Sequence, residues 1–339
     1  MKAAVFHGIG DIRIEDAAVR QPKEHEVVVK IAYCGICGTD VHIYHGDKGA
    51  AETVPPIILG HEMSGIITET GAGVKRLKPG DHVAIDPNYY CGECYYCRSG
   101  QEHLCASMNG IGTTLNGGFA EYCTLPAKAV LKVPNDMPLD EAAFAEPLAC
   151  CLHGIDLTNI SVGNQVLLIG GGTIGLIMLQ LTKLAGASFI RLIEPDEKKR
   201  ELALRLGADQ VFANEQDYAA FAQSQDDVRA DRVIECVGKT ETVAAAIRAA
   251  TKGATIMLFG LTPPEATVEI RPFEIFQKEL HITASFVNPL TEARAVELLA
   301  SGRIRTAELI SERIPLEQLA DALSNPKYRK MAKVLVKLS

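Results

Sequence analysis

A run in the middle of the chain sets its fold: Gln165-Val166-Leu167-Leu168-Ile169-Gly170-Gly171-Gly172-Thr173-Ile174-Gly175. Its apolar first part predicts a buried strand over residues 165–169. A glycine-rich turn follows at once, then an apolar helix over 176–185 and a second strand over 189–193. Strand, tight turn, helix and strand in this order predict one repeat of a parallel α/β sheet.

The glycines of this turn have the G-x-G-x-x-G spacing of dinucleotide-binding sites. Gly170 permits the tight turn, Gly172 lets the backbone approach a pyrophosphate, and Gly175 allows the helix to pack closely on the strand. Thr173 and Ile174 lie between these glycines, and the N-terminus of the helix that follows faces the phosphates. The motif alone is weak, but its position between a strand and a helix makes these five residues candidate cofactor ligands.

Glu194, about twenty residues after the motif and at the end of the second strand, indicates which dinucleotide binds. Its carboxylate can accept hydrogen bonds from both hydroxyls of the adenosine ribose, and it repels a 2′-phosphate. NAD is therefore favoured over NADP. Lys198, Lys199 and Arg200 lie close behind, and a cation there suits a 2′-phosphate, so NADP stays an alternative and Lys199 a candidate cofactor residue. We expect these charges to form the solvated face of a helix over 197–206.

Strands and helices keep alternating after this unit. Strands are predicted over 232–236, 255–259 and 281–286, with a helix over 241–250. Alternation at this spacing predicts a doubly wound parallel sheet. Because ligands bind at the carboxyl ends of such strands, Val237 and Gly260 are expected to line the cofactor crevice.

Residues 1–135 consist instead of short runs rich in Val, Ile and aromatic residues, separated by turn signals. We predict strands over 2–6, 11–15, 26–34, 65–70, 82–85 and 119–124. This pattern is typical of an irregular β barrel or sandwich with no helical period. Later in the sequence we predict helices over 138–157, 292–301 and 316–324, and a strand over 332–338 that returns to this first domain.

Cys91, Cys94, Cys97 and Cys105 lie within residues 86–112, a stretch dominated by Pro, Asn, Tyr and Gly. Cysteines at this spacing converge when the chain curls around one ion. The alternative, a lobe held by disulfides, is disfavoured in a reducing cytoplasm. Four thiolates close a tetrahedral shell, so we predict a structural zinc that stabilises a lobe without a core of its own.

Other residues with metal-ligand chemistry are dispersed. Cys37 and His61 are good zinc ligands, but most isolated Cys and His residues are structural, so the pair is weak evidence alone. Glu146 stands just before Pro147 in an apolar run, where a carboxylate is unfavourable unless it is paired or ligated. The alternative for Glu146 is an exposed position at a helix end.

The composition excludes several classes of function. A chain of 339 residues favours two domains. The formal net charge of −8 and the absence of Trp argue against nucleic-acid binding and against an anionic membrane surface. The first residues lack the apolar run of a signal peptide, and the longest apolar run, near 166–184, is broken by glycines. We therefore expect a cytoplasmic protein that neither binds nucleic acid nor spans a membrane.

Five features, taken in order, resemble the zinc-dependent medium-chain dehydrogenases along essentially the whole chain. They are residues 35–42, Gly60-His61-Glu62, the four-cysteine lobe, Glu146-Pro147-Leu148 and the glycine motif at 170–175. The resemblance implies a GroES-like β-rich catalytic domain over 1–148 and 288–339, with the zinc lobe at 86–112. It implies a Rossmann NAD-binding domain over 149–287, and an active site in the cleft between the two.

The resemblance also implies roles for single residues. Cys37, His61 and Glu146 would hold a catalytic zinc. Glu62 would be a direct ligand or a neighbour that exchanges with one, a choice that the sequence leaves open. Asp40 would orient His61 from behind.

Two further residues would move a proton. Thr39 would take the proton of the substrate hydroxyl, and His42 would be its exit near the cofactor ribose. Zinc lowers the pKa of an alcohol, and NAD then accepts the hydride.

Glu146-Pro147 resembles the polyol and threonine dehydrogenase branch, because simple alcohol dehydrogenases have cysteine at that place. We therefore expect an enzyme with two zinc ions per chain that transfers hydride from a secondary alcohol of a sugar alcohol to NAD, giving a ketose. L-threonine 3-dehydrogenase and 2,3-butanediol dehydrogenase are the alternatives, and a non-catalytic zinc-binding scaffold is the alternative from another class. A homotetramer or dimer is expected, in which the strand over 281–286 can pair across the dimer.

Overall fold

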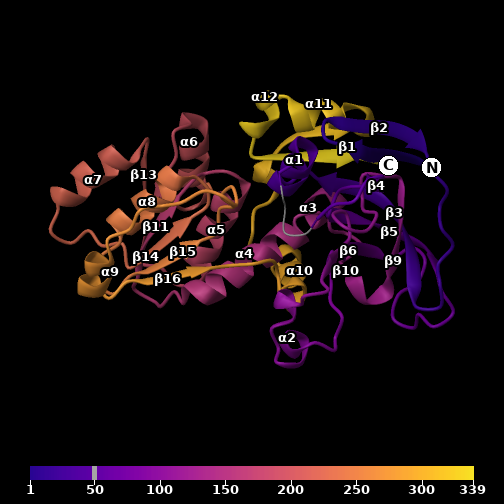
Figure 1. The fold of residues 1–339 in the computed structure, drawn as a ribbon, viewed down its shortest axis with the longest axis horizontal. Coiled ribbons are helices and arrows are strands. Elements are labelled where there is room, and N and C mark those ends of the chain that lie inside the picture. Colours follow the sequence, from indigo (N-terminus) through magenta and orange to yellow (C-terminus); the bar gives the residue numbers. More distant parts are fainter. Residues whose placement is uncertain (48–51) are drawn as a thin grey trace. The chain divides into compact units, whose positions relative to one another are not determined.

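The structure is a computed structural model that describes residues 1–47 and 52–339, and no site residue predicted above falls in the gap. The chain forms two compact units (Figure 1). Unit 1 comprises Met1–Ala149 and Asn288–Ser339, and unit 2 comprises Cys150–Val287. Unit 1 is rich in β structure and unit 2 contains a parallel α/β sheet, so the predicted two-domain fold class is confirmed.

Unit 2 is built on six parallel strands in the order β13-β12-β11-β14-β15-β16. The strands are β11 (Gln165–Ile169), β12 (Phe189–Ile193), β13 (Gln210–Phe212), β14 (Arg232–Glu235), β15 (Thr255–Leu258) and β16 (His281–Ala284). The helices are α5 (Thr173–Leu184), α6 (Glu197–Leu206), α7 (Glu215–Gln223), α8 (Thr240–Ala249) and α9 (Pro272–Lys278). β13, α7 and α9 were not predicted from the sequence; β13 is only three residues long and α7 is rich in polar residues.

The strand order of this sheet reverses between β11 and β14. The chain adds β12 and β13 on one side of β11 and then returns to place β14 on the other side. Crossovers that diverge from adjacent strands leave a crevice at the carboxyl edge of the sheet, where such folds bind ligands. The turns at 170–172, after β11, and at 236–239, after β14, both lie at this edge.

Unit 1 contains a seven-stranded sheet in the order β10-β6-β5-β3-β18-β17, with β9 also paired to β3, and a three-stranded sheet β2-β1-β4. Its strands are β1 (Lys2–Gly8), β2 (Asp11–Asp16), β3 (Glu26–Gly35), β4 (Ile57–Ile58), β5 (Glu62–Thr70), β6 (His82–Ile85), β9 (Tyr122–Pro126), β10 (Val130–Lys132), β17 (Ile310–Pro315) and β18 (Lys333–Lys337). β18 runs antiparallel to β3, with Leu335 opposite Gly35. The predicted return of this strand to the first domain is confirmed.

Residues 1–135 contain helices that the sequence did not predict. α1 (Gly38–His45) is an eight-residue helix that ends at Gly46, whose φ is 86°. It is short and polar, and only Asp40, Ile43 and Tyr44 in it are buried, so no apolar period marks it. The zinc-lobe segment also contains α2 (Tyr95–Arg98), between β7 (Asn88–Tyr89) and β8 (Asn109–Gly110).

The helix predicted over 138–157 is two helices, α3 (Leu139–Ala142) and α4 (Ala145–Thr158). Pro147 lies in the first turn of α4, where proline is tolerated because its missing N–H has no helical partner. The remaining helices of unit 1 are α10 (Glu292–Ala300), α11 (Leu319–Ser324) and α12 (Pro326–Arg329). α11 lies beside β2, and its Leu319 and Leu323 join one core cluster with Ala3 and Phe6 of β1 (Figure 1). Among the described residues, no helix has the length and apolar character needed to cross a membrane.

Candidate metal centres and dinucleotide site

Cys37, His61 and Glu62 come together in unit 1. Cys37 is the N-cap residue of α1, and His61 and Glu62 lie at the start of β5. The Cys37 Sγ, a ring nitrogen of His61 and a carboxylate oxygen of Glu62 all lie within 4.8 Å of one another. His61 and Glu62 are buried. A thiolate, an imidazole and a carboxylate at this separation form a donor set suited to zinc.

Asp40 contacts the backbone of Cys37 and the ring of His61. It is fully buried in the first turn of α1. Its Oδ2 accepts a hydrogen bond of 2.8 Å from the Cys37 N–H, and its Oδ1 lies 3.4 Å from Nδ1 of His61. With Nδ1 turned to Asp40, Nε2 of His61 is the nitrogen left for a metal.

The turn before His61 requires glycine. Gly60 has a φ of 96°, and a Cβ there would lie 2.8 Å from Sγ of Cys34 and 2.9 Å from the Phe119 ring. The Gly118 N–H donates to the Gly60 carbonyl at 2.8 Å. These contacts fix the backbone from which His61 projects.

Lys333 is a residue of this cluster that the sequence analysis missed. It is buried at the start of β18, forms an ion pair with Glu62, and donates a hydrogen bond of 3.1 Å to the Ile36 carbonyl. Burial alone would lower the pKa of Lys333, but the charges of Glu62, Cys37 and Glu146 outweigh burial and raise it. In the sequence, Lys333 stands next to the apolar run Val334–Val336, which is unusual for a buried lysine. Its partner could not be identified, because strand pairing cannot be read from one sequence.

Glu146 lies in the first turn of α4 and is buried, so the interpretation as an exposed helix end is wrong. It is not one of the three residues whose ligand atoms gather within 4.8 Å. Its negative charge acts on Lys333 and on the buried Glu292, whose pKa it helps to raise after the larger effect of burial. Glu146 therefore belongs to the buried charges around the cluster.

Thr39 and His42 lie on α1 close to these donors. The Thr39 Oγ1 is 3.8 Å from Sγ of Cys37. The side chain of His42 is 35% exposed, and its Nδ1 lies 3.0 Å from a carboxylate oxygen of Asp47. One helix thus carries a hydroxyl at the cluster and an imidazole that reaches solvent.

The charges around His61 favour a cation. Burial would lower the pKa of His61, but the Asp40 carboxylate and the Cys37 thiolate outweigh burial and raise that pKa well above its ordinary value of 6.5. A metal ion satisfies the same anionic surroundings without a proton. The residues present therefore fit zinc, held by Cys37, Nε2 of His61 and a carboxylate, with a position left for substrate.

The four cysteines of the lobe also gather around one point. Their Sγ atoms all lie within 4.8 Å of one another. The separations include 3.8 Å for Cys91–Cys97, 3.6 Å for Cys94–Cys97 and 3.5 Å for Cys105–Cys91. These separations are far longer than a disulfide bond, and all four are free thiols.

Neighbouring thiols in the lobe have opposite tendencies to ionise. The N–H groups of Glu93 and Cys94 each donate to Sγ of Cys91 at 3.4 Å and lower the pKa of Cys91 to about 6. Burial and the adjacent thiols raise the pKa of Cys97 to about 12. Because a divalent cation removes the repulsion between four thiolates, the lobe fits a zinc ion with a closed shell.

The glycine turn of unit 2 has the geometry of a phosphate cradle. Gly170 has a φ of 104°, and a Cβ there would lie 2.7 Å from Cγ2 of Val237. A Cβ on Gly175 would clash with the Gly170 carbonyl. A Cβ on Gly172, the N-cap of α5, would meet no atom within 4 Å. The turn is therefore open at Gly172, beside the helix start at Thr173 and Ile174, where a pyrophosphate fits.

Glu194 lies next to this turn. Its two carboxylate oxygens accept hydrogen bonds of 2.7 Å from the Gly171 N–H and 2.9 Å from the Asp196 N–H. Arg200 donates to the carbonyls of Glu194 and Pro195, at 2.8 Å and 2.7 Å. The backbone N–H of Lys199 donates a hydrogen bond of 3.1 Å to a carboxylate oxygen of Asp196. The Arg200 guanidinium is thus engaged by main-chain carbonyls.

Val237 and Gly260 follow β14 and β15, at the same edge of the sheet. Glu235, a buried carboxylate between them, is a second residue that the sequence analysis missed. In the sequence, Glu235 is visible as a single acid directly after two apolar residues of the predicted strand.

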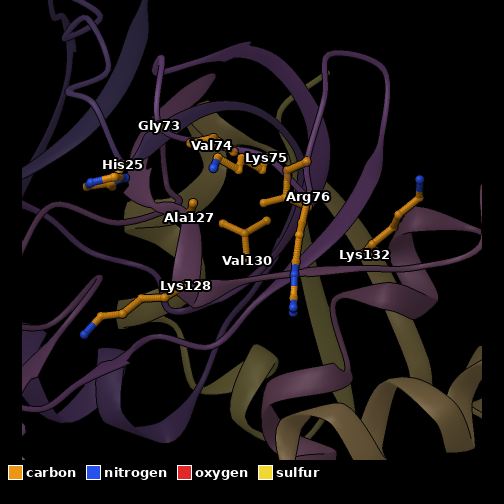
Figure 2. Close-up of a pocket in the computed structure, with 10 residues that line it drawn as sticks. His25, Gly73, Val74, Lys75, Arg76, Ala127, Lys128, Val130 and Lys132 are labelled. Atoms are coloured by element: carbon orange, nitrogen blue, oxygen red, sulfur yellow. The ribbon is translucent and has the colours of Figure 1, made fainter.

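A cavity of about 490 Å³ lies elsewhere in unit 1 (Figure 2). Its lining includes Lys75, Arg76, Lys128 and Lys132, and no candidate site residue. Lys132 pairs with Asp81 at 2.7 Å, and the Lys128 ammonium lies 4.1 Å from the centre of the Tyr89 ring. These cations are exposed, and we assign no function to the cavity.

Two family models match the chain. "Alcohol dehydrogenase GroES-like domain" matches residues 23–135, and "Zinc-binding dehydrogenase" matches residues 173–301. The first match lies within unit 1. The second covers most of unit 2 and continues into unit 1 after residue 287.

Whole proteins are also similar to this chain. D-arabinitol dehydrogenase 1 of Uromyces fabae is 34% identical, over 99% of this chain and 97% of the relative. Sorbitol dehydrogenase of Gallus gallus is 33% identical, over 99% of this chain and 96% of the relative. The solved structure of a zinc-binding dehydrogenase from Sinorhizobium meliloti 1021, bound to NADP, has a TM-score of 0.93 and 39% identity, over 99% of this chain and 98% of the other.

Proposed function

The chain belongs to the zinc-dependent medium-chain dehydrogenase family, in its polyol dehydrogenase branch, and we propose that it oxidises a secondary alcohol of a sugar alcohol to a ketose. NAD is the proposed hydride acceptor. Unit 1 is the proposed catalytic domain, with two zinc ions, and unit 2 the proposed cofactor domain. The observation that carries the proposal is the cluster of Cys37, His61 and Glu62, in which Asp40 contacts the Cys37 backbone and the His61 ring.

The residues of the cluster have different proposed roles. When bound, zinc acts as a Lewis acid that stabilises negative charge on the substrate oxygen. Cys37 and His61 hold the ion, Asp40 orients His61, and the third donor is a carboxylate. Glu62 lies in the donor set and Glu146 among the charges around it, so either acid can supply that carboxylate.

Thr39 and His42 provide the proposed exit for the substrate proton. Thr39 Oγ1, beside the Cys37 sulfur, accepts the proton of the substrate hydroxyl. At the same time it gives up its own hydroxyl proton toward His42. His42 transfers that proton to solvent, which its partly exposed ring contacts. Removing the proton at a fixed atom favours departure of the hydride, because the alkoxide is the better hydride donor.

NAD is proposed over NADP because Glu194 places a carboxylate beside the glycine turn, where it repels a 2′-phosphate. Arg200, which follows it in α6, is already hydrogen-bonded to two carbonyls. The similar protein solved with NADP makes a direct comparison of the two cofactors necessary.

The test is a substrate panel with purified protein, with NAD and NADP in parallel, followed by absorbance of the reduced cofactor and by metal analysis. We expect turnover of a sugar alcohol with NAD and two zinc ions per chain. Turnover of L-threonine or 2,3-butanediol without any polyol would overturn the substrate class. A single zinc ion, held in the lobe, and no turnover would favour a non-catalytic scaffold.

A further inference from the structure

Glu235 is a carboxylate in an apolar place. It ends β14, between β11 and β15 in the sheet, and is fully buried. Val233 and Ile234, which precede it, are fully buried as well. Burying a carboxylate is unfavourable unless hydrogen bonds compensate. The contacts of Glu235 therefore indicate why an acid occupies this position.

One oxygen of Glu235 accepts three hydrogen bonds. Its Oε1 lies 2.8 Å from the Val237 N, 2.9 Å from the Gly238 N and 2.7 Å from the Thr242 hydroxyl. Val237 and Gly238 form the turn after β14, and Thr242 lies in the first turn of α8. The carboxylate thus ties this turn to the helix start and supports Gly238 at a φ of 77°.

The main chain of Glu235 supports the neighbouring turn. Its carbonyl accepts hydrogen bonds of 2.9 Å from both Phe259 N and Gly260 N. The two turns also touch, since a Cβ on Gly260 would lie 2.7 Å from the Gly238 Cα and 2.7 Å from Oε2 of Glu235. A single residue therefore connects the turns after β14 and β15.

We propose that Glu235 is a positioning residue of the dinucleotide site. It holds the backbone of Val237 and Gly260 in the arrangement that the cofactor binds, and it touches no cofactor itself because its side chain is buried. The inference rests on the proposed function for the identity of the cofactor. Without the carboxylate, three donors lose their acceptor and the turn samples other conformations. The cofactor must then order the turn on binding, which weakens affinity.

The experiment measures NADH affinity by fluorescence titration of the zinc-loaded full chain and of its variants. Glu235→Leu removes the acceptor at similar volume, and we expect the Kd for NADH to rise about tenfold, the equivalent of 1.4 kcal/mol. Glu235→Gln keeps an acceptor oxygen, so its Kd should stay within about threefold of wild type. Zinc content should be unchanged in both variants.

Ile234→Ala is the matched control, because it weakens the same strand without touching either turn. We expect it to lower the melting temperature while the Kd for NADH stays within about twofold. A wild-type Kd in Glu235→Leu, or an equal loss of affinity in Ile234→Ala, overturns the inference. Should Glu235→Leu not fold, Thr242→Val removes one of the three donors, and an unchanged Kd there overturns it too.

The same titration separates this inference from the proposed function. If wild type binds NADPH and not NADH, only the choice of NAD fails, and the variants are compared with NADPH. If wild type binds neither cofactor, the proposed function and the inference both fail.

Discussion

Lys333 and Glu62 form a buried ion pair beside the candidate metal ligands. Gly35 makes room for it, because a Cβ there would clash with the Glu62 carboxylate and lie 2.8 Å from Cε of Lys333. The lysine neutralises one anion in a group that also contains Cys37 and Asp40. It thereby limits the charge that a bound cation must balance.

We expect Lys333→Met to lower the free energy of unfolding of the zinc-free protein by about 3–5 kcal/mol, because Glu62 keeps its buried charge without a partner. Zinc should recover part of this loss, since the freed carboxylate can then interact with the ion. The measurement is urea unfolding with zinc and after chelation.

Lys327→Met is the control for this variant. Lys327 pairs with Glu312, and the two side chains are 59% and 35% exposed. Removing it should cost about 0–1 kcal/mol and leave the response to zinc unchanged. If zinc raised the free energy of unfolding equally in wild type and in Lys333→Met, the explanation through an unpaired Glu62 charge would be contradicted.

At the level of elements, the cysteine lobe has little packing of its own. α2 contains no buried residue, and Tyr95 is 78% exposed. A segment with so little apolar burial depends on its cross-link for order.

Cys94→Ser and Cys37→Ser should therefore fail in different ways. Cys94→Ser loses the lobe zinc, and we expect a lower melting temperature because the lobe unfolds locally. Cys37→Ser should abolish turnover with little change in melting temperature, because β3 and β5 hold that region without metal. Thermal scans, zinc analysis and activity are measured together, and equal destabilisation by both variants would contradict the division between a structural and a catalytic ion.

Glu292, at the start of α10, makes stability depend on pH. Burial, followed by the charges of Asp86 and Glu146, raises its pKa well above the ordinary value of 4.5. The folded state therefore binds this proton more tightly than the unfolded state. Its contribution to stability is full below pH 4.5 and is lost as pH rises through the raised pKa.

We expect Glu292→Gln to reduce this pH dependence, because the amide keeps a polar group beside Asn288 without a charge to bury. The measurement is the urea midpoint at pH 5 and pH 8 for both proteins. The decrease in the urea midpoint from pH 5 to pH 8 should be smaller in the variant than in the wild type. A fall of the same size in both would show that Glu292 does not cause it.

For the whole molecule, β16 is an open edge of the sheet in unit 2. Ile282 on this strand is 41% exposed, and Phe273 and Phe276 of α9 are 70% and 77% exposed. Unpaired edges with apolar neighbours favour pairing with another chain.

We expect oligomers that assemble through this edge, and Ile282→Lys should shift them to a smaller species. Light scattering coupled to gel filtration measures the mass. Val162→Lys is the control, since Val162 is 88% exposed but lies outside β16 and α9. A wild-type mass for Ile282→Lys would place the interface elsewhere.

The sequence predicted best what is local in the chain. The glycine turn and the cysteine lobe each lie within a few consecutive turns of backbone, so spacing alone brings their residues near one another. Lys333 could not be predicted, because its place beside Glu62 depends on β18 pairing with β3, and strand order is not encoded in spacing. α1 was missed because its stability comes from the Asp40 contact with Cys37 rather than from an apolar face.

The position of β18 between β3 and β17 also sets an order of events during synthesis. Between His61 and Lys333 the ribosome adds 272 residues (333 minus 61), which takes roughly 14–54 s at about 5–20 residues per second. Throughout that interval β3 lacks this neighbour and Glu62 lacks its lysine. Unit 2, whose residues 150–287 are continuous, is translated within the same interval and can fold first. The nascent chain can therefore complete unit 2 before Lys333 reaches Glu62.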